Sequence, residues 1–152
     1  MAIKKPLVYT NGQVERLQPG DSLDLERTVT KTANGILPIC TAVYTQGGNA
    51  TPAQADAPNT TRVIGLVQAA AADTDPVEVQ VDGIVEALSA EWDAVTGQTG
   101  GLTEGAQYYL SATVAGGLTP TSPDAFGEFS VPVGVALSAT EMDIEIGAPI
   151  KL

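Results

Sequence analysis

Hydrophobic and polar positions alternate with a period of two in two short stretches of the chain. Valines alternate with Glu78 and Gln80 in residues 77–81, and Met142, Ile144 and Ile146 alternate with acids in residues 142–146. Successive side chains of a β-strand point to opposite faces. The period therefore predicts two strands, each with an apolar face on a core and a polar, largely acidic face in solvent.

These strands close a pattern that occurs twice. Each copy has a strand-like run, a Gly-Gly turn, a Thr-Pro-x-x-x-Asp-Ala segment, an apolar run broken by one glycine, and an alternating acidic strand. The pattern predicts a duplicated β-motif within one domain, with units at about residues 35–88 and 105–152. The interrupting glycines, Gly65 and Gly134, indicate a bulge or a close backbone approach at equivalent places in the two units.

The remaining pattern predicts an all-β chain with at most one short helix. Asn11-Gly12 between apolar runs predicts a small hairpin or an extended arm at the N-terminus, and residues 26–34 a linking strand or loop. Strands are expected at residues 36–44, 62–69, 77–81, from 84 onward, 106–112, 129–137 and 142–146 continuing to 150, with a polar loop at 45–61 and a helix at 89–95. The expected organisation is an N-terminal arm at residues 1–31 and a small β-barrel or β-sandwich domain at residues 32–152.

The amino-acid composition limits the catalytic chemistry that the chain can carry out. The 152 residues include no histidine and one cysteine, which removes the commonest general base and rules out an intrachain disulfide. Cys40 lies in an apolar run and is expected to be a small buried hydrophobe. Aromatic residues make up only 5% of the chain, so the core is expected to consist of Val, Ile, Leu and Ala.

The formal net charge is −11, which predicts repulsion from nucleic acid and from anionic membranes. Five of the seven basic residues nevertheless lie in the first 31 positions: Lys4, Lys5, Arg16, Arg27 and Lys31. They are either solvated charges on loops and strand edges or a segment that docks on an acidic neighbour. The first residues lack the apolar stretch of a signal peptide, so synthesis and folding in a cytoplasm are expected.

Several motifs are more simply structural than catalytic. Asp56 and Asp124 recur in the duplicated pattern and are expected to cap turns. Asp73-Thr74-Asp75 resembles the start of a calcium loop but lacks the glycine and glutamate that such a loop needs. Residues 97–101 are glycine-rich without the lysine of a phosphate-binding loop, which indicates a flexible connection. Of Tyr108 and Tyr109, neighbours in a strand, one is expected in the core and the other exposed or at a subunit contact.

Residues 6–23 (PLVYTNGQVERLQPGDSL) resemble the opening of many tailed-bacteriophage virion proteins. Residues 105–111, 116–119, 133–138 and 143–146 are similar to a C-terminal module of the same proteins, and residues 63–67 and 79–83 to small β-rich capsid cement proteins. The resemblance covers both ends of the chain and carries no catalytic residues.

The resemblance implies a structural virion protein that binds the outside of a capsid and decorates it, without enzymatic activity, cofactor or metal. Its expected partners are the major capsid protein and further copies of itself, as a homotrimer or else a dimer. The five N-terminal basic residues are the candidate capsid contacts, and Trp92, Tyr108 and Tyr109 the candidate oligomer contacts. The alternatives are a fibre or receptor-binding module of a phage virion, a carbohydrate hydrolase that uses two carboxylates, and a prophage adaptor without a capsid role.

Overall fold

The computed structural model describes residues 7–10, 13–16 and 27–152, with side chains described from Arg27 onward. At the N-terminal end, β1 (Leu7–Thr10) and β2 (Gln13–Arg16) pair antiparallel, with Thr10 opposite Gln13. The two strands flank Asn11 and Gly12 in the sequence, and their pairing is that of a hairpin.

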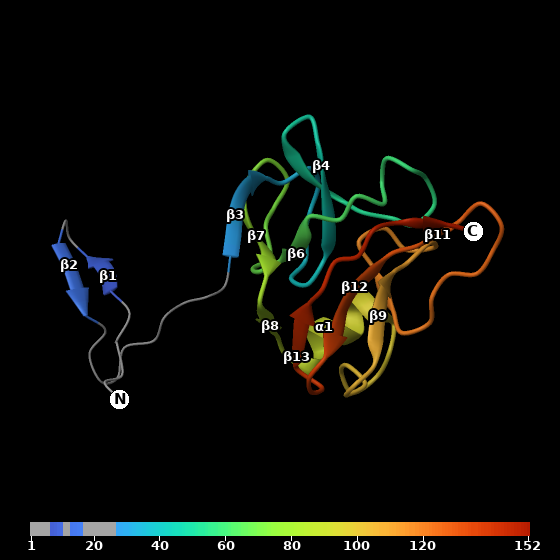
Figure 1. Cartoon of the computed structure of the whole chain (residues 1–152). Coiled ribbons are helices and arrows are strands. Elements are labelled where there is room, and N and C mark those ends of the chain that lie inside the picture. Colours follow the sequence, from blue (N-terminus) through green and yellow to red (C-terminus); the bar gives the residue numbers. More distant parts are fainter. Residues whose placement is uncertain (1–6, 11–12, 17–26) are drawn as a thin grey trace.

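Two five-stranded antiparallel sheets form the framework of residues 27–152 (Figure 1), which confirms the all-β prediction. The first sheet has the order β3 (Arg27–Thr32), β7 (Pro76–Asp82), β6 (Gly65–Val67), β4 (Ala42–Gln46), β5 (Asn49–Pro52). The second has the order β8 (Ile84–Glu86), β13 (Glu141–Ile144), β12 (Pro132–Ala136), β9 (Gln107–Leu110), β10 (Leu118–Thr119). A smaller sheet pairs β11 (Phe129–Ser130) with β14 (Ile150–Lys151).

The two large sheets share one topology. When the strands of each sheet are numbered along the chain, their spatial order is first, fifth, fourth, second, third in both sheets. The duplicated pattern is therefore a duplicated five-stranded unit. Each sheet also has a first strand that is not part of the repeated sequence pattern: β3 in the first sheet and β8 in the second. The sequence pattern assigns residues 84–86 to the first unit, but in the structure they pair with the second.

The register of the strands gives the residue correspondence between the units. Gly65 lies opposite Val43, and Gly134 lies opposite Tyr108. A Cβ at Gly65 would overlap the backbone oxygen of Gln80, and one at Gly134 would overlap that of Asp143. The expected close approach at equivalent glycines is confirmed, and β12 also carries a register shift beside Gly134.

In this correspondence, Gln80 of the first unit is equivalent to Asp143 of the second, and Val79 is equivalent to Met142. The repeated sequence pattern instead aligns Val77 with Met142, two residues away. Because side chains of a strand alternate with a period of two, a shift of two residues leaves every side chain on its expected face. The repeated sequence pattern therefore predicts correctly which side chains share a face, but it aligns the strands of the two units two residues out of register.

Each face of the first sheet contributes to a different apolar cluster. One face, with the segments that cover it, holds a small core of Ala33, Leu37, Val43, Ala50, Val67, Val77 and Val79. The sheet curls around this core until Ala33, just after β3, bridges to Ala50 on the opposite edge strand. The first unit thus encloses an interior of its own.

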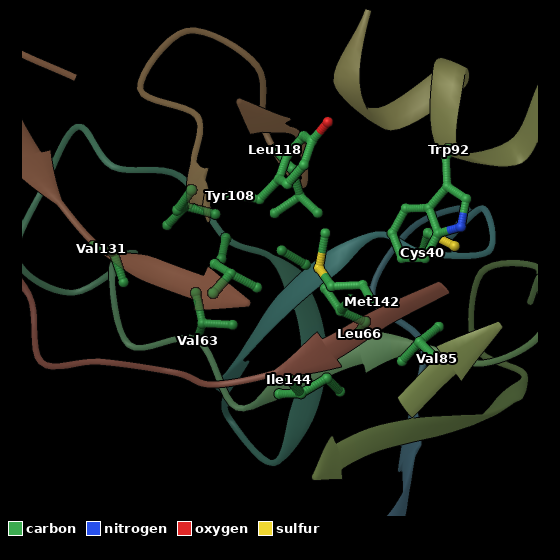
Figure 2. Packing of buried hydrophobic residues seen from close by; sticks show 14 of the residues in the cluster. Cys40, Val63, Leu66, Val85, Trp92, Tyr108, Leu118, Val131, Met142 and Ile144 are labelled. Atoms are coloured by element: carbon green, nitrogen blue, oxygen red, sulfur yellow. The ribbon is translucent and has the colours of Figure 1, made fainter. Parts of the chain in front are cut away.

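The opposite face of the first sheet packs against the second unit. Ala42, Tyr44 and Leu66 from this face join a larger cluster with Tyr108, Met142 and other residues on the inner face of the second sheet. Figure 2 shows side chains of both units gathered in this cluster. The two units therefore stack front to back, the outer wall of the first covering the interior of the second.

The predicted helix is α1 (Ser89–Thr96), which closes one side of the larger cluster. The Glu91 carboxylate accepts a hydrogen bond from the Leu88 N–H at its start, and Gly97 ends it with φ of 68°. Trp92 is 0% exposed, and its indole N–H donates to the Thr140 oxygen at 3.0 Å.

Two predictions about the first unit are wrong. Residues 36–41 are not part of a strand: β4 begins only at Ala42, because Cys40 has a φ of 65°, outside the extended region. The expected loop at 45–61 contains β5, which pairs with β4 through the Gly47-Gly48 turn.

The expected solvent face of β7 also fails at Gln80. This side chain is 1% exposed because the second unit covers its face of the sheet. Its amide N–H₂ donates to the oxygens of Asp82 and Ile84, which satisfies the buried group and fixes the link between the two sheets.

The equivalent glycines predict a matched pair of stability effects. Gly65→Ala and Gly134→Ala should each lower the free energy of unfolding by about 2–4 kcal/mol, because the added methyl group meets a backbone carbonyl that cannot move away. Gly48→Ala, where no atom lies within 4 Å but φ is 88°, should cost about 1 kcal/mol. Guanidinium unfolding of the three variants measures this order, and equal losses would contradict the packing argument.

Candidate interaction surfaces

The predicted basic residues divide between the two parts of the chain. Lys4 and Lys5 lie outside the described residues, and Arg16 ends β2, where side chains are not described. Arg27 and Lys31 both lie on β3, the edge strand of the first sheet, two places on either side of Val29. Arg27 is exposed and Lys31 is half-buried.

Charge is strongly separated along the chain. The first 31 residues hold five cations against four carboxylates, a net charge of +1, whereas residues 32–152 hold two cations against fourteen carboxylates, a net charge of −12. The N-terminal segment is therefore nearly neutral rather than strongly basic. It is positive only relative to the acidic domain that follows.

Two of the three aromatic residues expected at subunit contacts are unavailable. Trp92 and Tyr108 are both 0% exposed within the large cluster, so neither can touch another chain without unfolding. Tyr108 instead fixes the segment after α1, because its hydroxyl donates to the Gln98 side chain and accepts from the Thr103 N–H. Only Tyr109, half-buried on the outer face of the second sheet, remains a candidate.

The two carboxylates predicted to form turns, Asp56 and Asp124, and the carboxylate of Asp73 have different environments. Asp56 accepts a hydrogen bond from the Thr60 hydroxyl at 2.9 Å, which agrees with a turn role although the donor is a side chain. Asp73 accepts the Gly35 N–H at 2.8 Å. Asp124 is exposed on the loop between β10 and β11.

The glycine-rich segment after α1 binds a carboxylate of the same chain. The Asp93 carboxylate accepts hydrogen bonds from the N–H groups of Gly100 and Gly101, at 3.0 and 2.7 Å. Both glycines have φ near 90°, a conformation that turns successive N–H groups toward one acceptor. The expected flexible connection is thus fixed to the helix by its own carboxylate.

Cys40 is buried, as the sequence predicts. Burial, together with the nearby Glu91 carboxylate, raises the pKa of its thiol to about 12. Thiolates rather than thiols are nucleophilic, so this cysteine is unreactive in the folded chain.

The structure also brings together a groove, lined by apolar and hydroxyl-bearing side chains, that the sequence pattern does not reveal. The groove has a volume of about 370 Å³ and lies between the end of α1, the turn from β9 to β10, and the loop from β10 to β11. Val95 and Val114 line it and also border a smaller hollow beside Ile36. Its members come from three segments between residues 94 and 128 that meet only in the folded chain, and no periodic pattern of the sequence marks them.

A single residue beside the groove was detectable in the sequence. Phe126, one of only two phenylalanines, stands in a loop between Ala125 and Gly127, where no strand pattern buries it. It is 97% exposed. An aromatic residue in a polar loop is the signal that could have marked this surface.

No protein-family model matches the chain, and no curated protein is significantly similar to it. Among residues 7–10, 13–16 and 27–152, no cluster of three or more acidic or cysteine side chains could hold a metal ion. In the same part of the chain, no helix has the length and apolar character needed to cross a membrane.

The raised pKa of Cys40 predicts a pH dependence of stability. Above pH 9 the thiol ionises in the unfolded chain but stays protonated in the folded one until about pH 12. The unfolded state then binds fewer protons, so stability falls by up to about 1.4 kcal/mol per pH unit in this window. Comparing the wild type with Cys40→Ala isolates this contribution from tyrosines and lysines, and parallel pH profiles would contradict it.

The Asp93 contacts predict a loss of stability on charge removal. Asp93→Asn should lower the free energy of unfolding by about 1–3 kcal/mol, because two charge-assisted hydrogen bonds weaken. Asp124→Asn removes the same charge from an exposed loop and should change it by less than about 0.5 kcal/mol. Thermal unfolding of both variants tests the difference.

Proposed function

We propose that this chain is a structural protein of a bacteriophage virion, which binds the outer surface of the capsid and stabilises it. The observation that carries the proposal is the position of Arg27 and Lys31 on an edge strand, directly after the N-terminal segment with the other three clustered cations. The virion role itself rests on the sequence resemblance of residues 6–23 and of the C-terminal segments.

An edge strand suits attachment because it presents backbone N–H and C=O groups to a partner. Within the described residues, β7 is the only strand paired with β3. In this proposal, a partner strand with acidic side chains meets Arg27 and Lys31. The major capsid protein is the partner in this proposal.

The proposed role requires no catalysis and no cofactor. The chain acts as a homo-oligomer, for which the resemblance implies a trimer or else a dimer. With a net charge of −12 over residues 32–152, the domain opposes contact with nucleic acid, which favours a protein surface as its target.

Co-sedimentation with empty expanded capsids of the encoding phage tests the proposal. Full-length protein should sediment with the capsids, and the variant Arg27→Glu/Lys31→Glu should lose at least about tenfold in affinity, since each exchange converts an attraction into a repulsion. Added salt should weaken binding of the wild type, because screening acts on exposed charges.

Arg62→Glu/Lys151→Glu is the matched control. It changes the net charge by the same amount at two exposed positions away from β3, and it should bind like the wild type. Wild-type protein that stays in the supernatant would refute the proposal. Binding to host cells or surface glycans without capsid binding would support the receptor-binding alternative instead.

A further inference from the structure

Phe126 is the most exposed large apolar side chain among the described residues. It is 97% exposed on the loop between β10 and β11, whereas the other phenylalanine, Phe129, is buried. The neighbouring Gly127 N–H donates to the Leu152 oxygen, and the Leu152 N–H donates to the Glu128 oxygen. These bonds hold the loop against the C-terminal strand, where Ile150 is also exposed.

The groove described above lies beside this loop. Thr121, Pro123 and Glu128 of the loop line one of its sides. Glu128 is the only charged residue in its lining, and the adjoining hollow has none. Val114 is 56% exposed between the two depressions. Depletion of charge together with exposed apolar groups is typical of the centre of an interface.

We propose that this end of the molecule is a self-association surface, in which Phe126 of one copy inserts into the groove of a second copy. A phenylalanine buries about 150–250 Å² when it enters such a site. In its own chain Phe126 contacts almost nothing, so its own groove does not bury it. A projecting apolar side chain and a groove with one charged lining residue, Glu128, are complementary surfaces when they occur on one molecule and meet between two copies.

The positions of Phe126 and the groove favour a reciprocal contact. Both lie on the same side of the molecule, since the loop that carries Phe126 also lines the groove. Two copies related by a twofold axis can then exchange their phenylalanines, so that each contact occurs twice. The patch is small compared with the roughly 1,200–2,000 Å² of a standard interface, so the affinity expected is micromolar rather than nanomolar.

The inference does not rest on the proposed capsid role. Figure 1 shows β3 at one end of the two-sheet body, and the C-terminus with the loop before β11 at the other. The two contacts also respond to salt in opposite ways. Salt weakens an attachment through Arg27 and Lys31, whereas it strengthens apolar association between chains that each carry a charge of −11.

Sedimentation velocity over a range of concentrations provides the first test. The full-length chain should pass from monomer to dimer, with tighter association in high salt. Phe126→Ser should weaken the association by at least about tenfold. Leu88→Ser removes a similarly exposed apolar side chain, at the opposite end of α1, and should leave it unchanged. A wild-type chain that stays monomeric throughout, or an undiminished association of Phe126→Ser, would overturn the proposal.

A disulfide cross-link provides the second test and identifies the contact directly. Ala125→Cys, which keeps the adjacent Phe126, and Val114→Cys are made in separate chains, mixed and oxidised with oxidised glutathione; the buried Cys40 does not compete. A disulfide-linked dimer containing one chain of each variant is expected on a non-reducing gel. Ala125→Cys mixed with Ile84→Cys, an exposed position on the second sheet, should give little cross-linked dimer. Equal yields from the two mixtures would overturn the assignment of the groove.

Discussion

The structure depends on the front-to-back contact between the two sheets. The second sheet cannot enclose its own apolar inner face, because its edge strands β8 and β10 do not meet. Its interior is covered by α1 and by the outer wall of the first sheet. The first unit therefore has to be apolar on both faces, and Leu66 and Val67, adjacent on β6, are both fully buried in different clusters.

Small residues make this contact close enough for backbone hydrogen bonds between the units. The segment after β5 runs alongside the second unit, where the Ala55 N–H donates to the Ser111 oxygen and the Gly116 N–H to the Ala53 oxygen. A Cβ at Gly116 would overlap the Thr41 side chain. The contact thus combines apolar burial with paired backbone groups, which explains a core that is rich in alanine and glycine and poor in aromatic residues.

The same packing gives the molecule two different ends. One carries β3 with its two cations, and the other carries the exposed Phe126 and the groove beside its loop. Equivalent residues of the two units consequently have different environments. Tyr44 is 8% exposed because the second unit covers it, whereas Tyr109, at the corresponding position, is only half-buried on an outer wall that no third unit covers. Duplication has produced two similar sheets, but only one of them is covered on both sides.

The sequence by itself determined the features that depend on local geometry. A period of two defined the faces of β7 and β13, the glycines in apolar strands marked the close approaches at Gly65 and Gly134, and Asn11-Gly12 marked the hairpin. The wrong predictions share one cause. Gln80 was expected in solvent and is buried, and Trp92 was expected at a subunit contact and lies in the core. Alternation shows which residues share a face, but not which faces find a partner. That was decided by the stacking of one sheet on the other, through contacts between residues far apart in the chain.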